Sequence, residues 1–480
     1  MYRELLIHRY VNYSAILFLA VIMISCGSSG DNKANDKREK ISLDTLRVGT
    51  VYGPSTYFIY RNEPMGYEYE MVKKYADSRE IPVAVTVTSD FSELVSLLEN
   101  GKIDLLIDRV PMTSEYRDKI RHCGPVDISK QVLVQKKKEY SGKNYVADVT
   151  DLKGKEVYVE PETKYSQRIE NLNEELGGGI VIKYLSYDSL QLQNPIELVA
   201  NGQIPFTVSE ADIAEAEKTY YHYLDVSLPI SLDQKSSWAV RKDNDRLAND
   251  IDSWSRLIGS DADVKALHKR YFEDPKGEIF AEEKQSENVE ETNKAPMLNA
   301  SSISKYDKLF RKYAPQLNWD WRLLAAIGAV ESNFDDDATS WAGAEGVMQL
   351  MPNTAKEFGV SLNEIRNPDQ NIAASVKLIE HIDEMFSKYV PDKTERIKFI
   401  LAAYNAGEGH ILDGIALAEK YGKNKQVWDG NVRDVLMRKS HPDHLDDPAM
   451  KHGYFHATET INFVDKVLSN YNYYKQHIAA

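Results

Sequence analysis

The spacing of apolar and polar residues divides the chain into two regions with different periodicities. Between about residues 45 and 260, short apolar runs alternate with helical stretches, and beyond residue 300 apolar positions recur at helical spacing alone. The first region predicts an α/β fold with a largely parallel sheet, and the second predicts an all-α domain. We expect strands over 46–51, 83–87, 103–107, 157–159, 180–182, 206–208 and 236–240, and helices over 67–75, 91–99, 195–200, 244–271, 306–313, 321–334, 354–358, 372–389, 394–404 and 459–474.

The beginning of the chain has the pattern of an export signal. Arg3 and Arg9 precede an apolar run over 15–24, which is too short to span a bilayer comfortably. The following Met23-Ile24-Ser25-Cys26 resembles a bacterial lipobox. The resemblance implies that Cys26 becomes the lipidated first residue after cleavage and that acyl chains hold the protein at a membrane. We expect this to be the outer membrane, with the protein facing the periplasm.

Composition separates the remaining chain into domains. Segment 281–294 contains five Glu and one large apolar residue, so it cannot bury enough apolar area to offset its ordering entropy and is expected to be a boundary. In the α/β region, two lobes joined by two crossings predict a cleft that closes on a small ligand. The predicted organisation is a lipoprotein signal peptide over 1–25, a tether over 26–44, a two-lobed α/β domain over 45–272, an acidic linker over 273–300 and an all-α domain over 301–480.

Global composition excludes several classes of protein. With 480 residues, 42% of them hydrophobic, the chain is neither wholly disordered nor collagen-like. Its 59 basic and 74 acidic residues give a net charge of −15, which argues against a nucleic-acid partner. The two cysteines, Cys26 and Cys123, exclude a disulfide-stapled mini-protein, and we expect Cys123 to be a buried free thiol.

Three motifs in the α/β region resemble family 3 solute-binding proteins. They are the run over 60–70, Ser114-Glu115-Tyr116-Arg117, and the segment over 151–159, and the resemblance covers about residues 45–260. It implies that Arg117 clamps a ligand carboxylate, for which a planar guanidinium is suited, and that Glu210 takes the ligand's amino group. An ion pair at the surface or between lobes remains the alternative for Arg117.

One glutamate in the all-α region has the placement of a general acid. Glu331 lies at the edge of the apolar stripe formed by Leu323, Leu324, Ile327 and Val330, near the C-terminal end of its predicted helix. Partial desolvation and the helix dipole both raise the pKa of such a carboxyl. A carboxylic acid that stays protonated near neutral pH can donate a proton in catalysis. An ordinary glutamate at the core boundary is the alternative interpretation.

Ordered motifs around Glu331 resemble the soluble-lytic-transglycosylase domain, a lysozyme-like fold that cleaves peptidoglycan. The resemblance covers about residues 303–475 and rests on the segments 331–334, 338–340, 343–352, 403–407, 367–372 and 459–464. It implies that Glu331 is the single acid/base, cutting between MurNAc and GlcNAc and leaving a 1,6-anhydro end. By position it also implies a glycan cleft lined by Ser340, Gln349, Met351, Tyr404 and Asn405, with Gly343 and Gly346 allowing close backbone approach. Phe463 stands where a tyrosine is common, which is expected to lower activity or shift the pKa of the acid.

Two further clusters suggest metals but fit a metal site poorly. The run over 335–337 lacks the glycine and the terminal glutamate that a calcium loop requires, so we interpret it as a polar turn. His441, His444, His452 and His456 have metal-like spacing but bracket an Asp-rich insertion, for which a solvated loop is expected. No metal and no cofactor are predicted.

Together these features predict a lipid-anchored peptidoglycan lyase. Its partners would be glycan strands and, in the N-terminal domain, a small ligand or muropeptide that modulates the enzyme. Two alternatives remain open: a muramidase of the same fold in which Asp335, Asp337 or Glu345 assists water, and a binding or sensor lipoprotein with an inactive enzyme domain.

Overall fold

The computed structural model describes residues 43–88, 90–185, 194–276, 295–442 and 445–479. The export signal with Cys26, the segment 281–294 and His444 therefore lie outside the described residues. The described residues form one compact unit. Within the described ranges, no helix combines the length and the apolar character needed to cross a bilayer.

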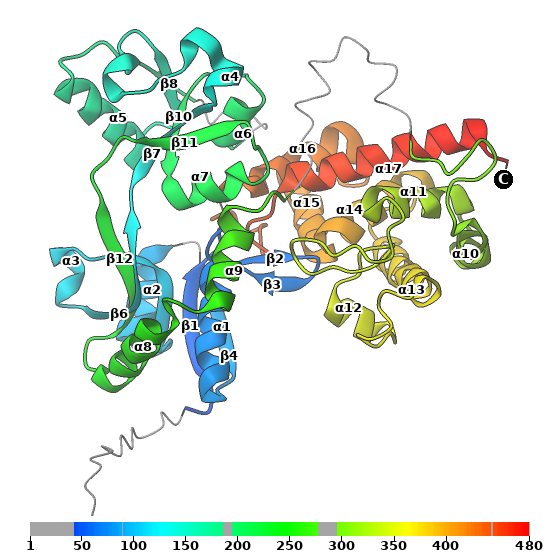
Figure 1. The fold of residues 1–480 in the computed structure, drawn as a ribbon, viewed down its shortest axis with the longest axis horizontal. Coiled ribbons are helices and arrows are strands. Elements are labelled where there is room, and N and C mark those ends of the chain that lie inside the picture. Colours follow the sequence, from blue (N-terminus) through cyan, green and yellow to red (C-terminus); the bar gives the residue numbers. More distant parts are fainter. Residues whose placement is uncertain (1–42, 89, 186–193, 277–294, 443–444, 480) are drawn as a thin grey trace, which may run out of the picture. The chain divides into compact units, whose positions relative to one another are not determined.

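The first lobe is built on a five-stranded mixed sheet in the order β4-β1-β5-β12-β6 (Figure 1). Strand β1 is parallel to β4 and β5, whereas β12 is antiparallel to both β5 and β6. The prediction of a largely parallel sheet is wrong here, because β6 leads the chain into the second lobe and β12 leads it back. The elements are β1 (Leu46–Val51), α1 (Tyr67–Arg79), β4 (Val83–Thr88), α2 (Phe91–Glu99), β5 (Leu105–Pro111), α3 (Ser114–Arg117), β6 (Ile120–Ser129), β12 (Gln234–Arg241), α8 (Asp245–Ile258) and α9 (Ala262–Phe272).

The second lobe contains an antiparallel sheet, β10-β7-β11, and a parallel pair, β8-β9. Its buried apolar residues form two clusters that are separate from the main core. The neighbouring residues Leu133 and Val134 of β7 belong to different clusters, one on each side of the strand. The elements are β7 (Gln131–Lys136), α4 (Lys138–Ser141), β8 (Glu156–Val159), α5 (Lys164–Glu175), β9 (Val181–Tyr184), α6 (Pro195–Ala200), β10 (Thr207–Glu210), α7 (Ala211–Lys218) and β11 (Leu224–Pro229). The two-lobed α/β prediction is thus confirmed.

The C-terminal region is all-α, as predicted. The long helix α17 packs along α11, the helix that carries Glu331. Asp320 caps the start of α11 by accepting a hydrogen bond from the Arg322 amide at 3.0 Å, and Asn333, with φ 51°, ends it. The helices are α10 (Asp307–Tyr313), α11 (Trp321–Ser332), α12 (Pro352–Glu357), α13 (Pro368–Phe386), α14 (Lys393–Ala406), α15 (Glu408–Lys420), α16 (Arg433–Leu436) and α17 (Ala457–His477).

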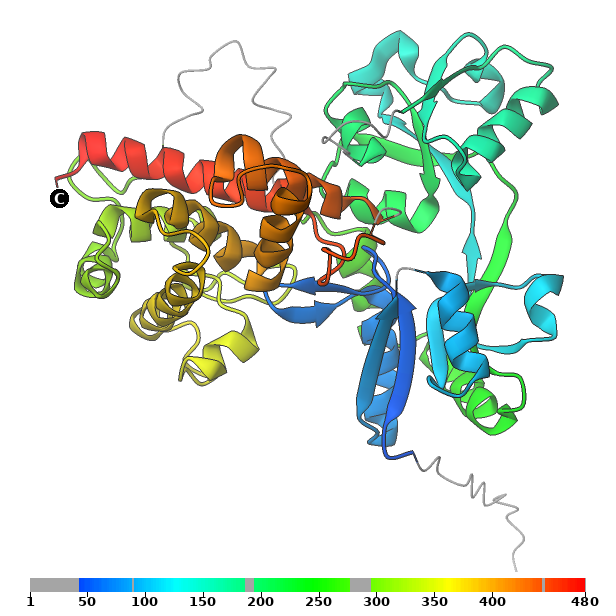
Figure 2. The same ribbon diagram turned by 180° about the vertical axis from the view of Figure 1, so that it is seen from behind.

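A short hairpin projects from the first lobe between β1 and α1. It consists of β2 (Phe58–Tyr60) and β3 (Glu63–Met65), joined by a two-residue turn. Both turn residues are left-handed, Arg61 at φ 48° and Asn62 at φ 66°, as a tight hairpin turn requires. The apolar core is continuous from the first lobe through Phe58 and Met65 into the C-terminal helices. Figure 2 shows the hairpin, in blue, reaching the yellow and orange helices.

Candidate active site and interlobe cavity

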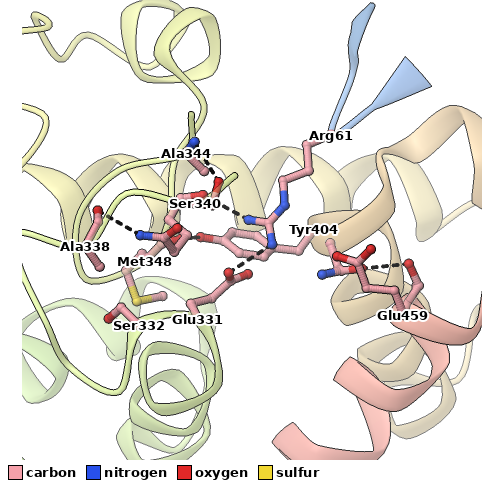
Figure 3. Close-up of polar contacts among 12 residues, drawn as sticks. Arg61, Glu331, Ser332, Ala338, Ser340, Ala344, Met348, Tyr404 and Glu459 are labelled. Carbon is pink, nitrogen blue, oxygen red and sulfur yellow. Dashed lines mark hydrogen bonds and ion pairs between the residues drawn. The ribbon is translucent and has the colours of Figure 1, made fainter. Parts of the chain in front are cut away.

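The carboxyl group of Glu331 is buried beneath the tip of this hairpin. Its side chain is 4% exposed, and its Oε2 accepts a hydrogen bond from Nη2 of Arg61 at 2.9 Å (Figure 3). Burial raises the pKa of Glu331, Arg61 lowers it and the charge of Glu459 raises it, with a net rise. The predicted upward direction is confirmed, and burial is its largest cause. A raised pKa favours the protonated form of the carboxyl, which general-acid chemistry requires.

Arg61 bridges Glu331 and the loop that follows it. Its Nη1 donates to the carbonyl of Gln349 at 2.9 Å, and its backbone N–H donates to the carbonyl of Ala406 at 3.2 Å. The side chain is only 10% exposed, so both charges of the Arg61–Glu331 pair are removed from water. Breaking such a pair by removing one partner costs about 3–5 kcal/mol, because the remaining charge is left uncompensated. The guanidinium of Arg61 covers the Glu331 carboxyl.

Neighbouring hairpin residues bind the rim of the same site. Tyr60 donates its hydroxyl hydrogen to Glu459 Oε1 at 3.0 Å, and Glu63 accepts the Asn353 N–H at 3.1 Å. Asn62 contacts Glu408, and the Ile59 carbonyl lies 2.9 Å from His410 Nε2. These contacts reach α12, α15 and α17 at once. The hairpin is consequently fixed over the site by more than the Arg61 ion pair.

The five residues predicted to line a glycan cleft lie around this covered centre. Tyr404 donates to the carbonyl of Met348 at 2.6 Å, and burial raises the pKa of its hydroxyl. Gln349 donates to the carbonyl of Ala338 at 3.1 Å, and Ser340 accepts the Ala344 N–H at 3.0 Å. The remaining members are Met351, which is 3% exposed, and Asn405, whose Oδ1 accepts from the Thr460 hydroxyl at 2.6 Å. Their contact with a glycan stays a prediction.

A fully buried amide organises the loop over 343–351. Asn371 accepts the Met348 N–H at 2.8 Å and donates to the carbonyls of Ile365 at 2.8 Å and Glu345 at 3.1 Å. Gly346 packs against this amide with φ +80°. The sequence motif that contains Asn367 and Asn371 includes this residue, but the order of the motifs does not indicate that the Asn371 amide is buried and hydrogen-bonded.

Two glycines of this loop provide a matched test of its packing. We expect Gly346→Ala to destabilise the protein by at least about 2 kcal/mol more than Gly343→Ala. Both have positive φ, but a Cβ on Gly346 would lie 2.7 Å from Asn371 Nδ2 and 2.9 Å from the Ile365 carbonyl, whereas one on Gly343 meets nothing within 4 Å. Thermal unfolding of both variants measures the difference. Equal losses would show that strain at positive φ, and not the fit against Asn371, determines the cost.

The acidic run over 335–337 and the histidines with metal-like spacing contact other protein groups. Asp337 donates its backbone N–H to Asp335 Oδ1 at 3.0 Å, which is the geometry of a polar turn. His456 is buried between Glu217 and Glu197, at 3.4 and 3.5 Å; burial would lower its pKa, but the two carboxylates raise it to about 9. The solvated-loop prediction is therefore wrong for His456. Among the described residues, no three His, Cys, Asp or Glu side chains are grouped to hold a metal ion.

Three other predicted residues are placed as follows. His441 lies 3.0 Å from Glu160 and is buried, so it too is not in a solvated loop. Phe463 lies on α17 and is 7% exposed. Cys123 is a buried free thiol, as predicted.

Between the lobes lies a cavity of about 670 Å³. Glu210 lines it, held by the Ser129 hydroxyl at 2.8 Å and by Lys164 at 3.1 Å. Arg117 lies exposed on α3 and is not part of the lining, so its role as a carboxylate clamp stays a prediction. The arginine that lines the cavity is Arg109 on β5, which the sequence analysis missed.

Comparison with known proteins identifies both regions. Residues 46–274 match the family of bacterial extracellular solute-binding proteins, family 3, and residues 308–427 match the transglycosylase SLT domain. These matches coincide with the two lobes and with the helices around Glu331. The likeness to solved structures is modest: substrate-binding domain 2 of Lactococcus lactis GlnP, in the open conformation, is 14% identical with a TM-score of 0.41, covering 49% of this chain and 97% of that one.

Relatives with both regions are similar along most of the chain. The protein named membrane-bound lytic murein transglycosylase F of Aeromonas hydrophila subsp. hydrophila is 30% identical over 433 residues, which are 89% of this chain and 81% of that relative. The protein of the same name from Pseudomonas fluorescens is 29% identical over 444 residues, which are 90% of this chain and 85% of that relative. The similarity therefore extends over the solute-binding and the helical regions together.

Proposed function

We propose, from the premise that this chain belongs to the family of membrane-bound lytic murein transglycosylase F, that Glu331 performs the chemistry and that the N-terminal domain controls access to it. The chain is a peptidoglycan lytic transglycosylase with a solute-binding-like N-terminal domain. The observation that carries the proposal is the buried Glu331 carboxyl covered by Arg61 of the other domain.

The reaction requires only one carboxyl group. Glu331 donates its proton to the oxygen that joins MurNAc C1 to GlcNAc, and the glycosidic bond breaks with oxocarbenium character at C1. The resulting carboxylate then takes the proton of the MurNAc 6-hydroxyl, whose oxygen attacks C1 of the same sugar. Water is not consumed, and the product has a 1,6-anhydro end. Because the attacking hydroxyl belongs to the same ring, its effective concentration is high and a second carboxylate is unnecessary.

The contacts of the hairpin support a resting state in which the hairpin covers Glu331. Arg61 fills the space next to the acid and lowers the pKa of Glu331, so both substrate access and protonation are opposed while the hairpin stays in place. Withdrawal of the hairpin would restore both. We infer that a small ligand or muropeptide in the interlobe cavity shifts the first lobe, from which the hairpin projects, and thereby modulates the enzyme.

The remaining assignments concern location and substrate contact. Lipidation at Cys26 would hold the protein at the outer membrane, on the periplasmic side, where its glycan strands are. The names of the relatives, which describe them as membrane-bound, support an association with a membrane. Ser340, Gln349, Met351, Tyr404 and Asn405 would contact the glycan once the hairpin leaves.

Product analysis tests the reaction. We expect purified sacculi digested with the protein to yield muropeptides that end in 1,6-anhydro-MurNAc, which are 18 Da lighter than the hydrolysis products by the mass of one water. Mass spectrometry with and without prior reduction by borohydride distinguishes the two kinds of end, since anhydro ends are not reduced. Reducing MurNAc ends as the main product would overturn the lyase assignment in favour of a muramidase.

A further inference from the structure

The interlobe cavity has an excess of acidic groups. Asp108, Glu210, Asp212 and Asp446 line it, against the two bases Arg109 and Lys164. Both bases are already engaged, Lys164 with Glu210 at 3.1 Å and Arg109 with Asp212 at 3.5 Å. The cavity therefore presents net negative charge to whatever enters it.

Arg109 is further neutralised from its other side. Its Nη2 lies 3.0 Å from Asp127 and its Nε lies 3.8 Å from Glu68, in a neighbouring cavity of about 320 Å³ that shares Arg109. Three carboxylates thus surround one guanidinium. These carboxylates offset the charge of Arg109, so an anionic ligand is disfavoured, although its buried Nε makes no hydrogen bond of its own.

Asp108 is a carboxylate of this lining that has no direct ion pair in the part of the chain that the structure describes. Its Oδ1 accepts the Arg109 backbone N–H at 2.8 Å, and no lysine or arginine of the described ranges forms an ion pair with it. A register shift between β12 and β5, from Ser237 opposite Val110 to Ala239 opposite Leu106, marks a bulge at this point. Because a bulge changes the direction in which neighbouring side chains point, the adjacent residues Asp108 and Arg109 can both line the cavity, as they do here. Burial raises the pKa of Asp108, and the charges of Arg109 and Lys164 lower it, with a net rise.

A second, independent feature points to a missing ligand. Ser236 is 1% exposed and lines both cavities, yet its hydroxyl has no hydrogen-bond partner in the described structure. The Gln131 Oε1 atom, in the lining of the larger cavity, is buried and unpartnered as well. Buried polar atoms are normally hydrogen-bonded, so these two are free to bind an incoming polar group.

We propose that the larger interlobe cavity binds an organic cation, a primary amine or guanidinium of amino-acid to short-peptide size, whose N–H groups are accepted by Asp108 with Ser236 and Gln131 binding its polar neighbours. A metal ion is not favoured, because no metal-holding cluster exists among the described residues. A volume of about 670 Å³ suits a ligand of this size. The inference rests on the proposed function in that the N-terminal domain is taken to bind a ligand.

Two five-carbon probes of opposite charge test the proposal by calorimetric titration of the full chain. Cadaverine carries two amines and glutarate carries two carboxylates, and L-lysine adds an amino-acid-sized cation. We expect cadaverine and L-lysine to bind saturably, glutarate not to bind, and Asp108→Asn to weaken cation binding at least about tenfold. Asp263→Asn on α9, whose side chain is 81% exposed, is the matched control and should bind as the parent does.

Three results would overturn the inference: no saturable binding of either cation, glutarate binding as tightly as cadaverine, or cation binding that Asp108→Asn leaves unchanged. Thermal unfolding of each variant without ligand shows that it is folded. Because binding is measured without peptidoglycan, failure here is separate from failure of the lyase assignment, which the anhydro products decide. Binding without any change in lytic rate would leave this site in place and contradict only the proposed modulation.

Discussion

Glu331→Gln is expected to lower the release of soluble muropeptides from sacculi by about 10²- to 10⁴-fold, the usual contribution of a general acid. The amide has nearly the shape of the acid and can still accept the hydrogen bond from Arg61, but it has no proton to donate to the glycosidic oxygen. The effect should appear in the turnover rate and leave binding of the glycan largely unchanged. Initial rates over a range of sacculus concentrations measure both quantities.

A matched substitution shows whether the loss is specific. Glu380→Gln removes a carboxylate from an exposed position on α13 and should release muropeptides at the parental rate. Because Glu331→Gln also removes one charge of a buried pair, its thermal unfolding must be compared with that of the parent. A folded Glu331→Gln protein that is as active as its parent would remove Glu331 from the mechanism.

Much of the fold around Glu331 could be predicted from local patterns. The start of the first strand and the boundaries of α2 and α6 agree with the residue periodicity, because each of these elements buries one face and has a recognisable beginning. The placement of Glu331 at the edge of an apolar stripe was predictable for the same reason. Helix α11 is two residues shorter than expected, since Asn333 and Phe334 take positive φ.

Some helix boundaries and the pairing of distant strands were not predicted. The predicted single helix over 244–271 is two helices, because Asp261 caps a new helix start after Gly259. Helix α15 was not predicted, although it follows Gly407, whose φ of +98° ends α14. Strands β6 and β7 cross into and begin the second lobe, and their pairing partners are more than 70 residues away. Periodicity within a short window carries no information on such pairing.

The contact between Arg61 and Glu331 is the clearest case of this limit. The two residues are 270 positions apart, and each belongs to a motif assigned to a different domain. The short turn at Arg61 and Asn62 signals a hairpin, but nothing in the sequence indicates what the hairpin covers. The same holds for Asp108 and Arg109, whose shared orientation depends on a bulge against β12.

Arg61→Ala is expected to raise the lytic rate of the full-length protein at least about tenfold, which corresponds to about 1.4 kcal/mol and is less than the cost of breaking a buried ion pair by removing one partner. The substitution removes the group that covers Glu331 and leaves Tyr60, Asn62 and Glu63 with their own partners. Muropeptide release from sacculi measures the gain. Arg256→Ala, at an exposed position on α8, is the matched control and should change nothing.

The pH dependence of the Arg61→Ala protein separates removal of the cover from a general loosening of the fold. Arg61 lowers the pKa of Glu331, so its removal raises that pKa and keeps the acid protonated to higher pH. The alkaline limb of the pH–rate profile should therefore move upward, whereas loosening alone would change the rate without moving the limb. The double variant with Glu331→Gln should be as inactive as Glu331→Gln alone, because the gain acts through that carboxyl. An Arg61→Ala protein with the parental rate and the parental limb would show that the hairpin does not restrain catalysis.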